Sequence, residues 1–315
     1  KIIIKLLATQ MNMDVDISYL FKGDGKESAP IQTSIKGIIP NLSPIAAIKW
    51  LVSRATTVTG SPFFAYASMH DNNLRLGNLD CMLSQKAFNS KLPYTYNPAN
   101  VSNADTQTEV EKTFTIKALK TSKMANTLKL IQEGAVTSDM CNTNLNTGQI
   151  FNQHFSVRDT LDKLSGHGII GENQNVFDTE FLMDENAVDT FNAQNIHTVT
   201  SSGTYGRYKS YHDEFDATKF KKKLESKALH NHLYKNMMNV VVEGAGFIVS
   251  KASVGDIVNL KIVNDNTEQD KNASEEDLID KAKSGDCIIY DTRHTFSGTQ
   301  HTVSINVCKL ERLSQ

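Results

Sequence analysis

Cysteines are few in this sequence of 315 residues, and none is spaced from another as the ligands of a metal ion usually are. The four, Cys81, Cys141, Cys287 and Cys308, include no CxxC pair. We therefore expect free thiols, buried or half-buried, in a reducing compartment. The strand pairing described below brings Cys287 and Cys308 near one another, but no feature of the sequence requires a disulfide between them.

Long apolar runs are also absent. No window approaches the roughly 18 consecutive apolar residues that a membrane-spanning helix needs, so the sequence predicts no membrane insertion. The formal net charge is −2, which gives no bulk attraction to nucleic acid or to an anionic membrane. Hydrophobic residues make up 39% and charged residues 22%, as in ordinary soluble globular proteins. At this length we expect two or three domains, each with its own core.

The common catalytic and cofactor motifs are missing as well. There is no GxSxG elbow and no HExxH zinc helix. Gly244-Ala245-Gly246 lacks the Lys-Ser/Thr pair of a phosphate-binding loop, and no helix is expected after it, so we interpret it as a bulge in a strand. His230 and His232 lie two apart on an expected helix and cannot share a face to bind one ion. His294 and His301 have no carboxylate beside them in the sequence and are expected to pack or to lie at the surface.

Clusters of charged residues do not indicate a functional site either. Lysines cover much of one expected helix, at Lys219, Lys221, Lys222, Lys223 and Lys227. Because aromatic residues do not interleave with them, a solvated face is a better interpretation than a nucleic-acid site. The acidic group at 275–280 is typical of the start of a short surface helix and not of a metal cage. The sequence thus predicts no catalytic, cofactor-binding or metal-binding residue, and no enzymatic activity.

The most informative stretch is the C-terminal run 284–313, which predicts a long hairpin with a tight turn at 297–300. With this turn the cross-strand pairs are Phe296–His301, His294–Val303, Thr292–Ile305 and Tyr290–Val307. Side chains alternate between the faces of a strand, so the two faces differ. The apolar face carries Ile288, Tyr290, Phe296, Val303, Ile305 and Val307. The polar face carries Asp291, Arg293, Thr295, Thr302, Ser304 and Asn306. We expect the first face to join a core and the second to meet water or a wet channel, within a larger sheet or barrel.

The remainder of the chain predicts short strands around two clear helices. The first has Ser43 as N-cap and Pro44 at its first position, and the second runs from Asp216 to about Met238. All six prolines lie at or before Pro98, which indicates a change of architecture there. Further helical segments are expected at 1–13, 79–83, 121–133 and 157–164. Strands are expected at 34–39, 61–66, 74–76, 91–96, 111–119, 147–155, 239–250 and 256–263, an open hairpin at 196–211 around Ser201-Ser202-Gly203, and connecting segments at 99–109 and 264–283.

Several of these features occur together in one known family. They are the helix at 43–58, Pro62-Phe63-Phe64-Ala65-Tyr66, Asn73-Leu74-Arg75-Leu76, Leu79-Asp80-Cys81-Met82-Leu83, Pro93-Tyr94-Thr95-Tyr96, Leu130-Ile131-Gln132-Glu133-Gly134-Ala135 and Val254-Gly255-Asp256 before the terminal hairpin. In order and local pattern the chain resembles the baseplate hub proteins of T4-type contractile-tail bacteriophages. The family's N-terminal tube-forming segment has no counterpart here. The chain begins Lys1-Ile2-Ile3 without an initiator Met, and we expect the sequence to start inside a longer protein.

The resemblance implies a β-rich α+β fold with tandem tube-type antiparallel β-barrel domains and flanking helices, assembled as a trimeric, pseudo-hexameric ring. It implies one discontinuous barrel domain from 1–98 plus 236–315. It further implies the remaining part of a second tube-type domain at 99–148, its N-terminal part missing, and an inserted α+β domain at 149–235.

The implied function is a structural hub of the tail baseplate in the virion, which adapts the sixfold tail tube to the threefold central spike and forms part of the channel. The implied partners are two further copies of the chain, the tail tube and tube-initiator proteins, the central spike and other baseplate proteins. The genome only passes through the channel, and no cofactor is implied. The residues leave two other classes of function open. One is a fibre or adhesin-type binding module, and the other is a cell-wall hydrolase.

Overall fold

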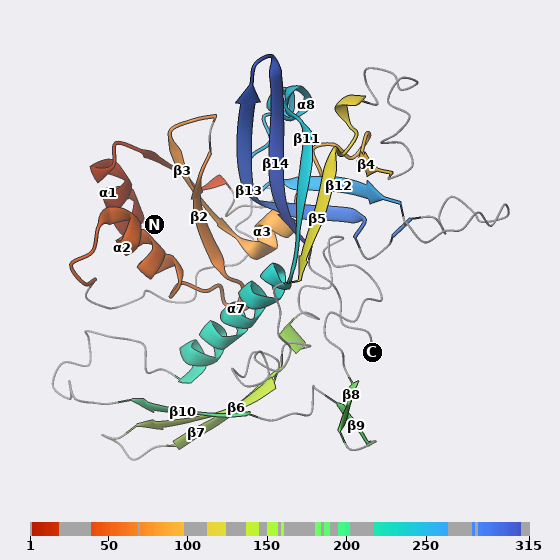
Figure 1. The fold of residues 1–315 in the computed structure, drawn as a ribbon. Helices are drawn as coiled ribbons and strands as arrows, with labels where there is room; N and C mark the ends of the chain where they lie inside the picture. Colours follow the sequence, from red (N-terminus) through yellow and green to blue (C-terminus); the bar gives the residue numbers. More distant parts are fainter. Residues whose placement is uncertain are drawn as a thin grey trace.

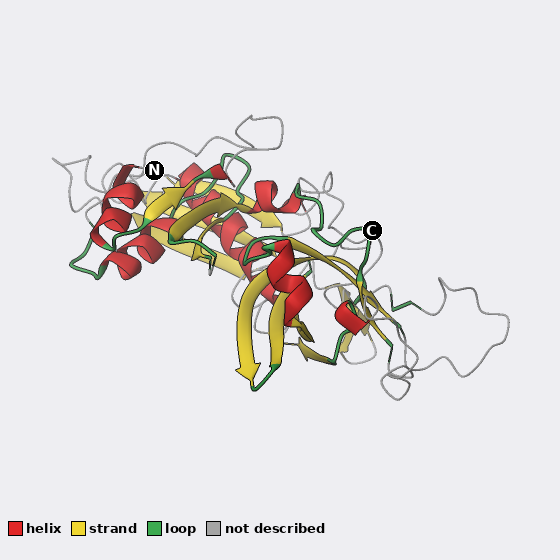
Figure 2. Cartoon of the chain, turned by 90° about the horizontal axis from the view of Figure 1, so that it is seen from above, coloured by secondary structure: helices red, strands yellow, loops and turns green. Residues whose placement is uncertain are grey.

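The computed structural model describes residues 2–18, 39–68, 70–97, 112–123, 137–144, 150–156, 159–160, 180–183, 186–189, 195–201, 217–263, 279–280 and 283–309. Over these residues the fold is β-rich with few helices, an α+β arrangement (Figure 1). Figure 2 shows the helices gathered mainly beside the N-terminal strands and along one side of the central sheet.

A six-stranded sheet, nearly closed into a barrel, forms the centre of the fold. Its order is β4–β12–β13–β14–β11–β5. The strands are β4 (Tyr94–Tyr96), β5 (Ala118–Lys123), β11 (Asn236–Glu243), β12 (Ile257–Ile262), β13 (Gly285–Ser297) and β14 (Gln300–Cys308). Neighbours are antiparallel except β4 and β12, which are parallel. A bridge between Thr95 of β4 and Thr115, which lies just before β5, brings the two edges of the sheet together.

The interior of this barrel is apolar and filled. Alternate residues of β11 and β14 point inward, and all are buried: Met238, Val240, Val242, Val303, Ile305 and Val307. The rings of Tyr94 and Phe247 belong to the same cluster and are fully buried. Removing this apolar surface from water stabilises the fold by about 25 cal/mol per Å². A small barrel whose inward side chains meet in this way is a packed core.

The terminal hairpin pairs as the sequence predicts over most of its length. Phe296 pairs with His301, His294 with Val303 and Thr292 with Ile305. The predicted pair Tyr290–Val307 is wrong, because a β-bulge shifts the register and Val307 pairs with Ile289. As a result Ile289 is fully buried, whereas Tyr290 is 43% exposed. A bulge inserts one extra residue in one strand and so moves the following side chains to the other face.

An N-terminal unit packs two helices on a small sheet. The sheet consists of β1 (Asp14–Asp16), β2 (Phe63–Ala67) and β3 (Asn73–Asn78) in the order β1–β3–β2. α1 (Ile2–Gln10) and α2 (Pro44–Val52) lie beside it (Figure 1). The predicted N-cap Ser43 and the proline at the helix start are confirmed, but the helix ends at Val52 and does not reach residue 58. α3 (Leu79–Leu83) follows β3 directly, as predicted, and its residues are all buried.

One long helix connects this unit to the barrel. α7 (Ala217–Lys235) starts where the sequence predicts and ends just before β11. Leu229 and Leu233 pack in a cluster with Leu79 and Leu83 of α3 and with Ile288 of β13. Phe155 joins the same cluster from β7 (Ile150–Ser156). That strand pairs with β6 (Thr137–Asn144), which also pairs with β10 (Asn195–Ser201), and β8 (Glu180–Met183) pairs with β9 (Asn186–Asp189).

Residues 244–250 form a helix where the sequence predicts a strand. The strand expected over 239–250 ends at Glu243, and Gly244-Ala245-Gly246 opens α8 (Gly244–Ser250) instead of forming a bulge. A short apolar run such as Phe247-Ile248-Val249 fits a strand and a helix equally well. In the structure Gly244 lies so close to the ring of His301 that a Cβ there would collide with it.

The segment 118–123 also differs from the prediction. Thr121–Lys123 were expected in a helix but form the end of β5, because β11 supplies a hydrogen-bonding partner along that whole length. β5 belongs to the central sheet although it lies in the segment 99–148, which the resemblance assigns to a second barrel. The division into domains stays a prediction. The strand expected at 34–39, except its last residue, the linker 99–109 and the acidic group at 275–278 lie outside the described residues.

Candidate functional site

The outer face of the barrel wall is polar and internally hydrogen-bonded. Asn239 of β11 donates from Nδ2 to Ser304 Oγ at 2.8 Å and to Asn306 Oδ1 at 2.7 Å, both on β14. Asn306 donates to Asp291 Oδ2 of β13 at 3.2 Å. These bonds connect three neighbouring strands from outside, so the polar face of the hairpin continues over the barrel. We call this surface the outer wall; it consists of Asn239, Asp291, Arg293, Thr295, Thr302, Ser304 and Asn306.

Charges near the outer wall are of both signs. Lys117, just before β5, forms an ion pair with Glu243 at the end of β11, and both side chains are part-exposed. Asp291 and Arg293 are exposed on β13. Exposed pairs of this kind contribute little to stability, about 0–1 kcal/mol. The wall is therefore a hydrated surface without a strong field of one sign.

The tip of the hairpin carries stacked rings on the side that faces α8. Phe296 is 67% exposed and stacks on His301, with ring centroids 4.2 Å apart. His301 stacks on His294, and a hydrogen bond of 3.1 Å joins His294 Nδ1 to His301 Nε2. Burial lowers the pKa of His294, and the positive charge of protonated His301 and of His70 lowers it further. In that bond one ring nitrogen donates and the other accepts, so the two imidazoles hold each other in place at the hairpin tip.

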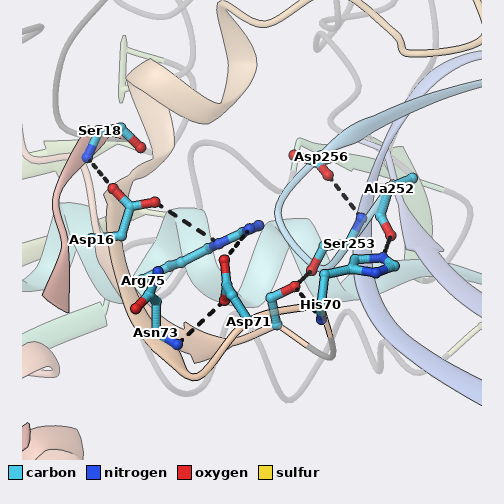
Figure 3. A network of polar contacts seen from close by, with 10 residues as sticks. Asp16, Ser18, His70, Asp71, Asn73, Arg75, Ala252, Ser253 and Asp256 are labelled. Atoms are coloured by element: carbon cyan, nitrogen blue, oxygen red, sulfur yellow. Dashed lines mark hydrogen bonds and ion pairs between the residues drawn. The ribbon is translucent and has the colours of Figure 1, made fainter. Parts of the chain in front are cut away.

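A polar network fixes the barrel to the N-terminal unit (Figure 3). Ser253, between α8 and β12, donates from Oγ to Ser68 Oγ at 3.0 Å, and its backbone N–H donates to Asp256 Oδ2 at 2.8 Å. His70 Nε2 lies 3.1 Å from the carbonyl oxygen of Ala252. Ser68 and Ser253 are both buried, so these hydrogen bonds satisfy groups that water does not reach. The network holds the loop after β2 against the start of β12.

Two cavities flank the barrel in the described part of the chain. The first, of about 590 Å³, lies between α7, β2 and the bulge of β13 and includes Phe64, His230 and Tyr290 in its walls. The second, of about 550 Å³, lies beside α8 and includes Leu92, Phe114 and Val249. Val249 is 83% exposed, so α8 presents an apolar side to the surface.

The residues singled out in the sequence are dispersed in the structure. The four cysteines are free, as predicted, and three of them are buried. His230 lines the first cavity, whereas His294 and His301 lie at the hairpin tip. In the lysine-rich stretch, Lys222 donates to Glu225 at 2.7 Å, so part of it is not a free solvated face. Sequence reasoning missed Glu225, a carboxylate only 1% exposed, because nothing in its helical spacing marks it as buried.

Two further observations concern metal binding and membrane spans. Among the described residues no group of three or more His, Cys, Asp or Glu side chains is arranged to hold a metal ion. In the same part of the chain, no helix has the length and apolar character to cross a membrane.

Comparison with known proteins gives weak structural likenesses. No protein-family model and no curated protein sequence matches the chain. A 43 kDa tail protein of prophage MuSo2 from Shewanella oneidensis is 10% identical, with a TM-score of 0.43, over 96% of this chain and 62% of that one. A tail protein from Neisseria meningitidis MC58 is also 10% identical at a TM-score of 0.43, over 97% of this chain and 65% of that one. The chain thus spans less than two thirds of each protein's length. TM-scores this low do not establish a shared fold.

Proposed function

We propose that this chain is a structural component of a bacteriophage tail, and more specifically the hub that adapts the sixfold tail tube to the threefold spike. In this role it forms a homotrimer within the baseplate and binds tube, spike and baseplate proteins without catalysing a reaction. The sequence resemblance to T4-type hub proteins supports the proposal. The tail proteins from Shewanella and Neisseria agree with it, but it does not rest on them.

The observation that carries the proposal is the contrast between the two faces of the barrel. Its interior is filled by apolar side chains, whereas its outer wall is a hydrogen-bonded polar surface. A channel for DNA therefore cannot run through one barrel and has to lie between copies of the chain. The outer wall has the polar, mixed-charge character that such a lumen requires, because a strong positive field would retain the passing genome.

The experiment places single cysteines on and away from the outer wall. In a Cys141→Ser background, Ser304→Cys marks the wall, and Lys91→Cys marks an exposed position elsewhere. We expect the assembled protein to react at both positions with a small maleimide. A maleimide on a large polyethylene glycol chain is expected to react readily only at position 91. Electron microscopy of the same sample is expected to show rings. A ring in which position 304 remains open to the large reagent would place the wall outside the lumen, and a monomer would contradict the hub itself.

A further inference from the structure

The aromatic walls of the cavity of about 590 Å³ come from three elements that are far apart in the sequence. Phe64 and Tyr66 come from β2, His230 and Tyr234 from α7, and Tyr290 from the bulge of β13. Cavities that bind small molecules typically measure about 300–1,000 Å³, so this one can enclose a compact organic ligand. The bulge is what turns Tyr290 toward α7 and away from the barrel interior.

Four rings form a continuous row along the cavity. Phe64 stacks on His230 at 5.1 Å between centroids with an interplanar angle of 15°. His230 meets Tyr234 edge-on at 4.6 Å, and Tyr234 meets Tyr290 edge-on at 4.9 Å. Such a row offers ring faces and ring edges to a flat or aliphatic body. Leu233 and Ile288, which also line the cavity, extend this apolar surface.

The charged residues among the described lining residues of the cavity are all lysines. Lys49 of α2 and Lys223 and Lys227 of α7 line it, and no Asp or Glu is among its described lining residues. Lys49 and Lys227 are exposed, so their ammonium groups can turn toward a ligand at the mouth. This charge disfavours a cationic ligand, although aromatic rings alone would accept one.

The polar groups inside the cavity are neutral. Burial lowers the pKa of His230, which keeps its imidazole uncharged at pH 7. Burial raises the pKa of Tyr234, and its hydroxyl lies 3.4 Å from His230 Nε2. A ligand body placed against these rings meets hydrogen-bonding groups but no buried charge, which would be costly to leave unpaired.

From these contacts we propose that the cavity between α7, β2 and the β13 bulge binds a small amphiphilic anion. The ligand has an aromatic or aliphatic body, which packs along the ring row, and a carboxylate or sulfonate, which lies at the mouth beside Lys49 and Lys227. This site is independent of the outer wall and of any assembly, so it stands or fails separately from the tail role.

The test uses two fluorescent probes of similar shape. One is the anion 8-anilinonaphthalene-1-sulfonate, and the other is the neutral N-phenyl-1-naphthylamine. We expect saturable binding of the anion with one site per chain, displaced by dodecanoate and weakened by added salt. All measurements use a Val249→Asp background, because the apolar side of α8 is the obvious alternative site for a dye.

Three variants locate the site and separate its two parts. Ser226→Tyr places a bulky side chain in the cavity wall and is expected to weaken both probes by roughly tenfold or more. Lys49→Gln with Lys227→Gln is expected to weaken the anion by about fivefold and leave the neutral probe unchanged. The matched control, Lys120→Gln with Lys251→Gln, removes two exposed lysines elsewhere and is expected to change the binding of neither probe.

Absent or non-saturable binding, or binding unaffected by Ser226→Tyr, overturns the site. An equal response of both probes to the cavity lysines overturns its preference for anions.

Discussion

Thr95 of β4 pairs with Thr115, and through this bridge the first and last strands of the central sheet meet. The backbone N–H of Thr95 donates to the carbonyl of Phe114, and that of Ile116 donates to the carbonyl of Thr95, both at 2.9 Å. Backbone groups of β4 and of residues 114–116 that would otherwise lie unpaired at an edge are thereby hydrogen-bonded within the chain.

The inside and outside of the wall are expected to respond differently to a new carboxylate. Ile305 is 1% exposed in the barrel interior, so Ile305→Asp buries a charge without a partner and is expected to cost more than about 3 kcal/mol or to prevent folding. Asn306→Asp faces outward, where it loses one donated hydrogen bond and sets a solvent-screened carboxylate beside Asp291, at a total cost of about 1 kcal/mol. Denaturant unfolding of both variants checks this, and equal destabilisation would mean that the two faces are wrongly assigned.

Phe247 and Val249 test whether residues 244–250 form a helix. In a strand these two side chains would share a face, but in α8 Phe247 is fully buried at the end of the barrel and Val249 is 83% exposed. Phe247→Ala is expected to lower the free energy of unfolding by about 3–5 kcal/mol. Val249→Ala is expected to change it by less than about 0.5 kcal/mol. Thermal denaturation measures both, and comparable losses would favour the strand that the sequence indicates.

Gly255 is held in a conformation and a space that only glycine fits. Its φ is +90°, and a Cβ would collide with the hydroxyl of Tyr66. Gly255→Ala is therefore expected to destabilise the protein by about 1–3 kcal/mol. Gly298, at the hairpin turn, has a φ of +58° but nothing within 4 Å of a Cβ, so Gly298→Ala isolates the backbone contribution. Tyr66→Phe is expected to recover part of the loss at position 255; no recovery would show that the collision is unimportant.

The stability of the protein is expected to fall as the pH drops through the range in which histidine titrates. Burial, His301 and His70 lower the pKa of His294, and burial lowers that of His230. Unfolded chains therefore bind more protons than the folded protein below the ordinary histidine pKa of about 6.5. The contribution of these two histidines to stability is complete above that pH, and it is lost as the pH falls toward their pKa values in the folded protein. Melting temperatures between pH 8 and pH 5 measure the slope, which His294→Gln is expected to reduce. An unchanged slope in that variant would remove His294 from the explanation.

Much of the local structure follows from the sequence, and the failures have a common cause. The Ser43-Pro44 start of α2 and the register at the hairpin tip are set by capping and turn chemistry within a few residues, so both are predictable. The bulge at Tyr290 shows only in the pairing of β13 with β14, and the start of α8 at Gly244 lies against the ring of His301, which is far along the chain. The same holds for the cavity, since Phe64, His230 and Tyr290 meet only after folding. The sequence shows directly that the common catalytic motifs are missing, but it does not show the outer wall or the cavity as surfaces.

The most direct test of the proposed hub is the native mass of the full-length protein, measured by native mass spectrometry or light scattering at micromolar concentration. The account predicts a trimer, either alone or after mixing with the spike protein of the same tail. A protein that remains monomeric with every tail component would contradict it.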